Sequence, residues 1–226
     1  MKNLMGWNWP DNEQHLLDWL ANPKGRMMLN GRLAYQGKKQ MALLDACPPD
    51  RRRTFIDVGG HIGLWSYNFA HWFKWVEAFE PVLEHRECFA KNVPPTVLDN
   101  VNLHPFALGE KPGSVRMITG PASSGDTRVD TSHISNTALV DMRTLDSFGF
   151  ADVDAIKVDC EGFEEFVLRG AADTIATWLP VICVEQKRDM AKRFGLDTLG
   201  AVKYLINELG YKTVTEISGD FIMVPA

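Results

Sequence analysis

The feature that most constrains the fold is a regular alternation of short apolar runs with longer amphipathic ones, beginning at Thr54. The runs TFIDV, WVEAFE and VNLHPFAL predict strands, and IGLWSYNFAHWF and VLEHRECFAKNV between them predict helices. The same order returns in DAIKVDC, FEEFVLRGAADTIATW, PVICVEQ and DTLGAVKYLINELG. Strands separated by helices predict a parallel sheet with helices on both faces. The closing YKTVTEISGDFIMVPA predicts two strands around a Ser-Gly-Asp turn, so we expect the last strand to be antiparallel.

Residues 1–50 lack the strand–helix alternation of the rest of the chain. They predict a small helical appendage to a main domain that spans residues 51–226. DNEQHLLDWLAN predicts a helix that begins with Asp11 as its cap and places three leucines on one face. NPKGRMMLNGRLAY carries turn signals and predicts a hairpin, and KKQMALLDAC predicts a second short helix. Trp7 and Trp9 are the aromatic residues that we would test for substrate contact.

Charge, cysteine content and hydropathy argue against several classes of protein. The net charge is -5, whereas a general nucleic-acid binder usually carries a basic excess, so nucleic acid is a disfavoured partner. The four cysteines form no CxxC pair and match no zinc pattern, so we interpret them as reduced thiols. No apolar segment reaches the length of a membrane span, and no cleavage signal precedes the first helix. We therefore expect a cytoplasmic protein, and the sequence leaves its oligomeric state open.

Polar side chains stand where the expected parallel strands end. In such a sheet, ligands bind beyond the carboxyl ends of the strands, near the point where strand order reverses. A carboxylate at the end of a buried strand needs a partner. The ends to inspect, four of which are carboxylates, are Asp57, Glu80, Ala107, Asp159 and Glu185. Their convergence on one edge predicts a ligand that offers hydrogen-bond donors.

The first of these strands leads into a glycine-rich loop, DVGGHIG. Gly59, Gly60 and Gly63 let the backbone approach a ligand closely. Their spacing differs from the GxGxxG of a dinucleotide-binding loop, and Asp57 just upstream would repel a phosphate. A ligand with a positive amino group and an adjacent ribose fits better, and S-adenosylmethionine has both. Glu80, about twenty residues after the loop, is placed to accept hydrogen bonds from both ribose hydroxyls.

With these motifs the chain resembles the FkbM-type methyltransferases, which depend on S-adenosylmethionine. The matching segments are FIDVGGHIGLWS, VEAFEPVLEHRECFAKN, NLHPFALGEKPGSV, MRTLDSF, DAIKVDCEGFEEFVLRGA and LPVICVEQ, in family order. The resemblance implies a class I methyltransferase fold, a Rossmann-like and mostly parallel seven-stranded sheet with an antiparallel last strand. The family usually has Ala-Asn where this chain has Gly60-His61, which puts the side-chain contacts of the loop in question. The cofactor-binding residues that the resemblance implies are Asp57, Gly59, Gly63, Glu80, Ala107 and Leu108.

Three residues are candidates for the chemistry of methyl transfer. KVDCEG places Asp159 and Glu161 on the same side of the fourth strand, if that strand is still extended there. Such a pair could bind a metal, receive a proton or position substrate hydroxyls. The alternative is structural, with Glu161 capping the next helix and Asp159 satisfying loop amides. His61, in the cofactor loop, is the third candidate, as a base near neutral pH or a surface histidine. A divalent metal held by Asp159 stays an open question, because the resemblance does not demand one.

A long polar stretch and one further strand end supply candidate substrate contacts. Residues 109–136 are either a functional lid or partly disordered. Arg128 and His133 in this stretch could recognise a polar substrate. Glu185, at the end of PVICVEQ, fits a substrate role and a structural role equally well.

These observations lead to one leading hypothesis and a rival from another class. The leading hypothesis is an S-adenosylmethionine-dependent O-methyltransferase that acts on a hydroxyl of a sugar, glycan or glycosylated small molecule. The resemblance supplies this acceptor class, and the residues supply only its polarity. The rival is a non-catalytic nucleoside-binding module or partner protein that keeps the methyltransferase fold. A nicotinamide-dependent oxidoreductase is disfavoured by the glycine spacing.

Overall fold

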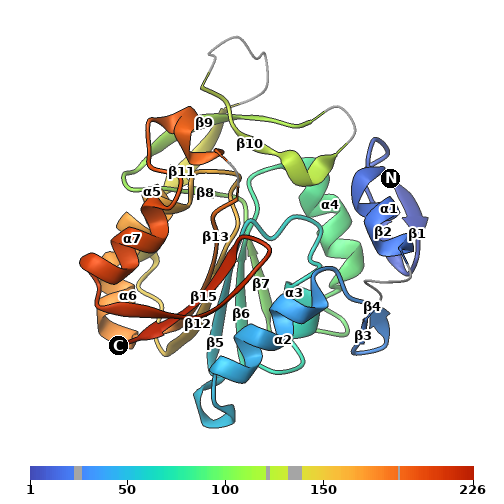
Figure 1. The fold of residues 1–226 in the computed structure, drawn as a ribbon. Coiled ribbons are helices and arrows are strands. Elements are labelled where there is room, and N and C mark those ends of the chain that lie inside the picture. Colours follow the sequence, from blue (N-terminus) through green and yellow to red (C-terminus); the bar gives the residue numbers. More distant parts are fainter. Residues whose placement is uncertain (23–26, 121–122, 132–138, 188) are drawn as a thin grey trace.

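A seven-stranded sheet forms the centre of the computed structural model, which describes residues 1–22, 27–120, 123–131, 139–187 and 189–226 (Figure 1). The strand order is β14-β15-β13-β12-β5-β6-β7. Neighbours from β13 to β7 pair in parallel, and β15 runs antiparallel to both β13 and β14, as the sequence predicted. The bounds are β5 Thr54–Val58, β6 Trp75–Phe79, β7 Val101–His104, β12 Val153–Val158, β13 Val181–Glu185, β14 Tyr211–Ile217 and β15 Asp220–Pro225.

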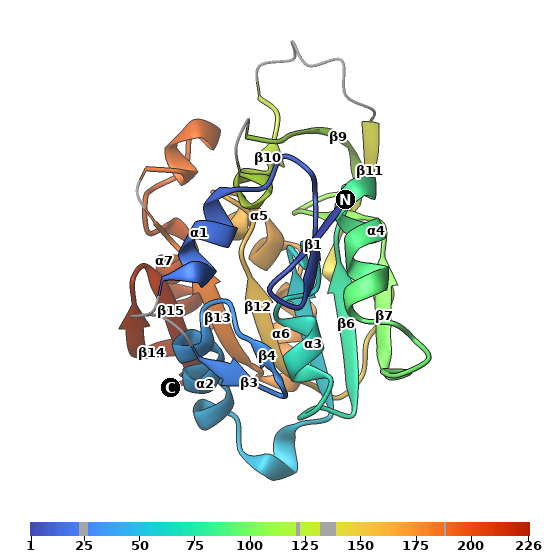
Figure 2. The same ribbon diagram turned by 90° about the vertical axis from the view of Figure 1, so that its right-hand side faces the viewer.

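Helices cover both faces of this sheet and bury a separate apolar core on each (Figures 1 and 2). On one face Val167, Ile175 and Leu205 are buried, from α5, α6 and α7 in turn. On the other face Phe69 and Phe89 are buried, from α3 and α4, and α2 adds leucines to the same core. The bounds are α2 Gly37–Ala46, α3 Ser66–Phe69, α4 Leu83–Asn92, α5 Glu164–Arg169, α6 Ala172–Trp178 and α7 Gly200–Asn207.

Three expected elements are interrupted. The helix expected over FEEFVLRGAADTIATW is divided into α5 and α6 at Gly170, where a Cβ atom would overlap the carbonyl oxygen of Gly109. The helix expected over IGLWSYNFAHWF contracts to the single turn of α3, because Gly63 before it adopts a left-handed φ of +88°. The strand expected over VNLHPFAL is divided at Pro105, which has no N–H for a sheet ladder.

The described part of the polar stretch 109–136 belongs to a second, four-stranded sheet with the order β10-β9-β11-β8. Between β9 and β10 the chain forms the short 3-10 helix η3, whose Ser124 is buried. Where it is described, the stretch contributes the strands β9 and β10 to this sheet and is otherwise turn and loop. The bounds are β8 Ala107–Leu108, β9 Gly113–Ile118, η3 Ser124–Asp126, β10 Arg128–Val129 and β11 Leu139–Arg143.

The N-terminal segment combines hairpins with helices and packs on the loop after β5 and on α4 through a third apolar cluster. Trp7 and Trp9 are fully buried in this cluster, so the expectation that they contact substrate is wrong. The first helix begins at His15 instead of after Asp11, because the Glu13 carboxylate accepts a hydrogen bond from the Leu16 N–H. The bounds are β1 Lys2–Leu4, β2 Trp7–Trp9, α1 His15–Ala21, β3 Met28–Leu29 and β4 Arg32–Leu33.

Three further 3-10 helices connect the larger elements: η2 Pro49–Arg51, η4 Leu145–Phe148 and η5 Ala191–Phe194. The four cysteines are free thiols. Among the helices that the structure describes, none combines the length and apolar character that crossing a bilayer requires.

Candidate active site

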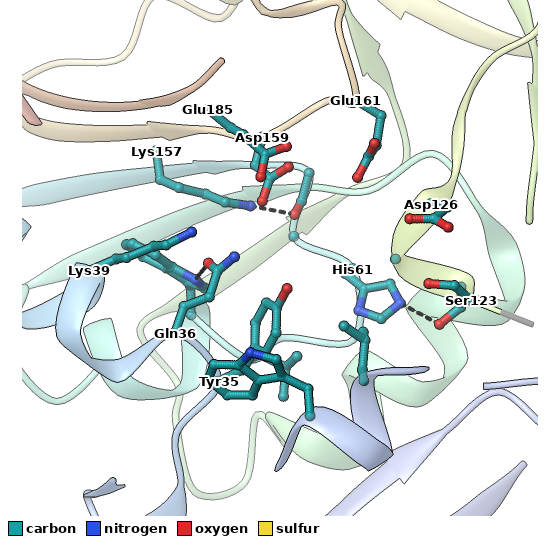
Figure 3. Close-up of a pocket in the computed structure, with 18 of the residues that line it drawn as sticks. Tyr35, Gln36, Lys39, His61, Ser123, Asp126, Lys157, Asp159, Glu161 and Glu185 are labelled. Carbon is teal, nitrogen blue, oxygen red and sulfur yellow. Dashed lines mark hydrogen bonds between the residues drawn. The ribbon is translucent and has the colours of Figure 1, made fainter. Parts of the chain in front are cut away.

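A cavity of about 540 Å³ opens where β5, β6, β12 and β13 end. The strand ends form one wall, with Asp159 and Glu185 close together, and the N-terminal segment forms another with Tyr35 and Lys39 (Figure 3). A second, smaller cavity of about 60 Å³ adjoins it and is mostly apolar. The residues common to both linings are Gly59, Glu80, Thr127 and Asp159, and the apolar lining of the smaller cavity includes Phe79, Phe106, Ala107, Leu108 and Phe163.

The three glycines of the loop are required for different reasons. Gly59 has a φ of +78°, and a Cβ atom there would overlap the carbonyl oxygen of Asp159. Gly60 has an ordinary φ, and a Cβ would sit 3.5 Å from the side chain of Ala78, so alanine fits there. Gly63 faces away from both cavities, and its Cβ would approach Val93 Cγ2 to 2.7 Å. The first two therefore shape the cavity, and Gly63 allows close packing on α4.

Asp57 is fully buried below the loop and already has two protein partners. Ser66 Oγ donates a hydrogen bond of 2.6 Å to Asp57 Oδ2, and Lys157 Nζ lies 3.2 Å from Oδ1. Lys157 also donates to the carbonyl oxygen of Gly59 at 2.7 Å. Burial alone would lower the pKa of Lys157, but the Asp57 carboxylate raises it, so the ammonium stays charged. The sequence reasoning missed Lys157, although a lysine inside the apolar run DAIKVDC was a visible signal.

The Glu80 carboxylate is held by backbone amides at the junction of the two cavities. Its Oε2 accepts a hydrogen bond of 2.9 Å from the His61 N–H, and its Oε1 accepts one of 2.8 Å from the Val82 N–H. The Nδ1 atom of His85 lies 3.3 Å from Oε1. These contacts fix the orientation of the carboxylate beside the glycine loop, which is where the sequence placed it.

A chain of polar contacts links His61 through Ser124 to Glu13 in the N-terminal segment. The Nε2 of His61 lies 2.8 Å from Ser124 Oγ, which donates a hydrogen bond of 2.6 Å to Glu13 Oε2. A carboxylate only accepts hydrogen bonds, so we assign the proton of His61 to Nε2 and leave Nδ1 as an acceptor. Burial, with the neighbouring His85 and Lys157, lowers the pKa of His61 well below its usual value, so the imidazole is neutral. His61 has a φ of +49°, a conformation that asparagine also tolerates.

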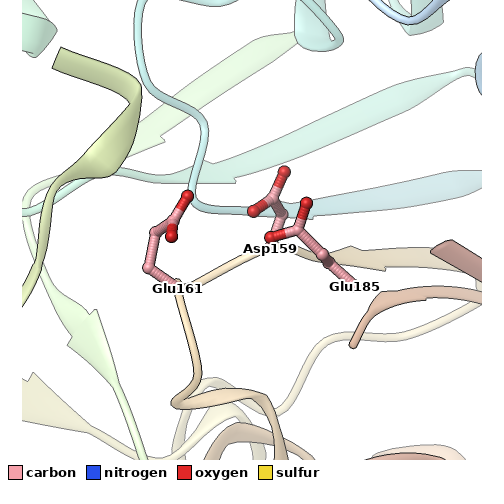
Figure 4. A group of neighbouring side chains, drawn as sticks. All are labelled: Asp159, Glu161 and Glu185. Atoms are coloured by element: carbon pink, nitrogen blue, oxygen red, sulfur yellow. The ribbon is translucent and has the colours of Figure 1, made fainter. Parts of the chain in front are cut away.

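Three carboxylates meet at the wall of the cavity that the strand ends form (Figure 4). One oxygen from each of Asp159, Glu161 and Glu185 lies within 4.8 Å of the others. Burial and the charge of Asp159 raise the pKa of Glu161 to about 8 and that of Glu185 well above its usual value. Burial alone would raise the pKa of Asp159, but Lys157 and other nearby cations lower it. The three groups therefore resist full ionisation unless a proton or a cation lies among them.

Glu161 reaches this cluster by a different route from the one expected. Strand β12 ends at Val158, so strand alternation does not extend to Glu161. A left-handed turn at Glu161, with a φ of +54°, directs its side chain into the cavity. The loop amides weighed as partners of Asp159 are bound by Glu164, whose Oε1 accepts hydrogen bonds of 2.9 Å from the Cys160 and Gly162 N–H groups.

The remaining predicted residues fall into three groups. Ala107 and Leu108 line the smaller cavity. Arg128 lines neither cavity, and its Nη1 donates a hydrogen bond of 3.2 Å to the backbone oxygen of Asp126. His133 lies outside the described residues. Trp19, which the sequence reasoning did not single out, lines the larger cavity.

Comparisons with known proteins address the family and the fold. A family model described as methyltransferase FkbM domain matches residues 57–213. The methyltransferase FkbM of Methylobacillus flagellatus KT is similar in structure, with a TM-score of 0.52 and 18% identity, over 76% of this chain and 43% of that chain. A methyltransferase from Geobacter sulfurreducens matches with a TM-score of 0.50 and 14% identity, over 84% of this chain and 78% of that chain.

A protein of the NADB-Rossmann superfamily from Streptococcus agalactiae also has a TM-score of 0.50, with 13% identity over 84% of this chain and 68% of that chain. At such identities these structures show the fold alone, and they confirm the Rossmann-like class that the sequence predicted. The chain spans less than half the length of the Methylobacillus structure. No curated protein matches the chain.

Proposed function

The chain belongs to the family of FkbM-type methyltransferases, and we propose from this premise that it transfers a methyl group from S-adenosylmethionine to a hydroxyl of a polar acceptor. The observation that carries the proposal is the pair of adjoining cavities that share Gly59, Glu80 and Asp159. One cavity is small and mostly apolar, and the other is larger and lined by both apolar and charged side chains. Together they match a ligand with a flat aromatic base, a ribose and a charged tail.

The smaller cavity is the proposed adenine site. Its walls carry Ala107 and Leu108, with aromatic rings around them, and it leads directly to Glu80. A ribose at this junction would offer two hydroxyl donors to the fixed Glu80 carboxylate. The methionyl tail would then lie in the larger cavity beside Gly59 and Gly60. We assign Asp57 an indirect role, in which it holds Lys157 beneath the loop, because its side chain is fully buried and forms an ion pair with Lys157.

The larger cavity has room for the acceptor beyond the methionyl tail. Its outer lining combines the aromatic rings of Trp19 and Tyr35 with the polar side chains of Asp126 and Glu161. Aromatic faces beside hydrogen-bonding groups suit a sugar, whose ring has apolar faces and hydroxyl edges. This lining supports a hydroxyl of a sugar, glycan or glycosylated small molecule as the acceptor. We propose that residues 1–50 are an appendage that shapes the acceptor end of the site.

Methyl transfer from a sulfonium is an in-line displacement, so the protein mainly aligns the acceptor oxygen with the methyl group. His61 is the proposed base, because its neutral imidazole leaves Nδ1 free to accept the hydroxyl proton. Ser124 and Glu13 are its proposed positioning residues. Asp159 and Glu161 are the proposed acids that orient the acceptor. Arg128 does not line the cavity, so we leave it out of the proposed acceptor site.

Two measurements test the proposal in sequence. Isothermal titration with S-adenosylmethionine should show one site, and Glu80→Gln should weaken it about 10- to 100-fold, because a hydrogen bond to a charged group contributes roughly 1.5–3 kcal/mol. Glu77→Gln is the matched control, since Glu77 is a buried acid of β6, the strand that precedes Glu80, but lies outside both cavities. No binding by the wild-type protein would refute the cofactor assignment.

The second measurement is turnover with a panel of sugars and glycosides, read as the mass increase of one methyl transfer. A product whose new methyl group sits on oxygen is the expected result, and His61→Gln should slow its formation while leaving cofactor affinity within about twofold. Cofactor binding without any methylated product across the panel would favour the non-catalytic nucleoside-binding module.

A further inference from the structure

We propose that Asp159, Glu161 and Glu185 together bind one hard divalent cation, such as Mg²⁺, Mn²⁺ or Ca²⁺, at the acceptor end of the larger cavity. The three side chains converge from the end of β13, the residue after β12 and the turn that follows (Figure 4). The inference extends the proposed function, since the cation would act in the same site, but its test needs neither cofactor nor acceptor.

The spacing of the three carboxylates suits such an ion. Their ligand oxygens all lie within 4.8 Å of one another. Oxygens on opposite sides of Ca²⁺ are about 4.6–5.2 Å apart, and those around Mg²⁺ are about 4.2 Å apart or closer. Three oxygens at this largest separation would lie about 2.8 Å from a central ion, so the cluster accepts Ca²⁺ after a small contraction and Mg²⁺ or Mn²⁺ after a larger one. The donor set contains only carboxylate oxygens, which these cations prefer, and no histidine or thiolate that would favour zinc.

One atom of the cluster points to a missing partner. Glu185 Oε2 is buried and has no hydrogen-bond partner within the described part of the chain. The side chain that carries it is only 6% exposed, and in Figure 4 its carboxyl group lies against that of Asp159. An unpaired carboxylate oxygen in the interior is costly, because water cannot replace the missing contact. A cation between these carboxyl groups would satisfy it.

The charges around the cluster also leave room for a cation. Lys187 contacts Glu185 Oε1 and, at 3.0 Å, Asp220, and Lys39 contacts Asp220 as well. Lys157 is paired with Asp57. In the described ranges, Asp159 and Glu161 have no ion pair within 4.0 Å. The residues counted here are five carboxylates, Asp57, Asp159, Glu161, Glu185 and Asp220, and three ammonium groups, Lys39, Lys157 and Lys187.

If all eight groups are ionised, they leave an excess of negative charge, and burial beside Asp159 raises the pKa of both Glu161 and Glu185, so a proton or a cation has to offset part of this charge. Like charges held together in a poorly solvated site repel strongly unless a counter-ion or a proton intervenes. A shared proton between Glu185 and Asp159 is the competing occupant, and it predicts no metal affinity. If the cation is bound, an acceptor hydroxyl that ligates it would lose its proton more readily.

The test is a titration of the chelator-treated, full-length protein with Mn²⁺, followed by the electron paramagnetic resonance signal of the free ion. We expect one site per chain, from which Mg²⁺ or Ca²⁺ displaces Mn²⁺. Asp159→Asn, Glu161→Gln and Glu185→Gln should each weaken Mn²⁺ binding at least tenfold. Glu84→Gln, which removes an exposed carboxylate from α4, is the control and should bind Mn²⁺ as the wild type does.

Thermal unfolding with and without Mn²⁺ gives an independent reading. The midpoint of the wild-type protein should rise with Mn²⁺, and the midpoint of Glu161→Gln should not, since a ligand that binds only the folded state stabilises it. Among the described residues, the Glu161 side chain forms no hydrogen bond or ion pair, so this variant keeps the test usable if Asp159→Asn fails to fold. Absence of Mn²⁺ binding at millimolar concentration, or equal binding by all three variants, overturns the proposal. Mn²⁺ binding without methyl transfer would instead count against the proposed function alone.

Discussion

The two sides of the cavity differ in how their polar groups are satisfied. On the glycine-loop side, both oxygens of Glu80 accept backbone hydrogen bonds, and Asp57 Oδ1, which accepts no hydrogen bond from the described residues, forms an ion pair of 3.2 Å with Lys157. On the carboxylate side, Glu185 Oε2 has no hydrogen-bond partner in the described ranges, and Asp159 and Glu161 face the cavity. The protein itself therefore holds the carboxylates of the glycine-loop side in place. The second side is incomplete without a ligand, which is the expected difference between a cofactor platform and a site of chemistry.

The first prediction tests the buried Asp57–Lys157 pair and has the largest expected effect. Lys157→Met should lower the free energy of unfolding by roughly 3–5 kcal/mol, because it leaves the Asp57 carboxylate buried without its cationic partner. Chemical denaturation measures the change. Lys203→Met, which removes an exposed lysine paired with Asp197 at 2.9 Å, is the control and should change stability by less than about 1 kcal/mol. Equal effects of the two substitutions would show that the loop side is not held by its buried ion pair.

The second prediction separates two adjacent glycines of the loop. Gly59→Ala should cost at least about 2 kcal/mol of stability, because it combines a left-handed φ with an overlap on Asp159. Gly60→Ala should stay within about 0.5 kcal/mol, because its Cβ meets only ordinary contacts. Urea unfolding of the two variants compares them directly. A costly Gly60→Ala together with a tolerated Gly59→Ala would contradict the loop geometry.

The third prediction concerns pH and the chain from Glu13 to His61. The pKa of His61 is lowered in the folded protein, so below pH 6.5 the unfolded chain binds the proton that the folded chain resists. Stability should therefore fall as the pH drops below 6.5, by up to about 1.4 kcal/mol per pH unit from this residue. The groups around the ring are His85, Glu80, Lys157 and, through Ser124, Glu13.

His61→Gln isolates this contribution, because glutamine can still donate to Ser124 but does not titrate. The difference in unfolding free energy between the wild type and this variant should shrink as the pH falls from 6.5 to 5.5. A difference that stays constant over that range would mean that His61 titrates normally in the folded state.

The fourth prediction concerns Glu161 on the carboxylate side and has the smallest expected effect. Glu161→Gln should stabilise the metal-free protein by about 0.5–1 kcal/mol at pH 9, where the wild-type carboxyl is ionised beside Asp159. The pKa of Glu161 is raised to about 8, so its charge opposes folding increasingly as the pH rises from about 4.5 to 8. The gain should therefore fade towards pH 5. A loss of stability at pH 9 would indicate that this side is already satisfied.

The sequence predicted the features that depend on local pattern. Alternating apolar runs gave the strands, and the rule that ligands bind at strand ends directed attention to Asp57, Glu80, Asp159 and Glu185, which all line the cavity. The glycine loop was recognisable for the same reason, since sharp turns of the backbone need particular residues. Errors arose where a distant segment decided the outcome, as at Gly170, where the carbonyl of Gly109 interrupts a helix that its own residues favour.

What the sequence determined by itself is therefore the order of the elements, the edge of the sheet that carries the site and the family. Only the tertiary structure decided which side chains share that edge. Lys157 stands opposite Asp57 because β12 pairs with β5 in one particular register. Glu13 reaches Ser124 across 111 positions of the chain. Periodicity and turn chemistry are local properties that a sequence displays directly, whereas lateral pairing and charge balance arise only when the strands and segments are packed together.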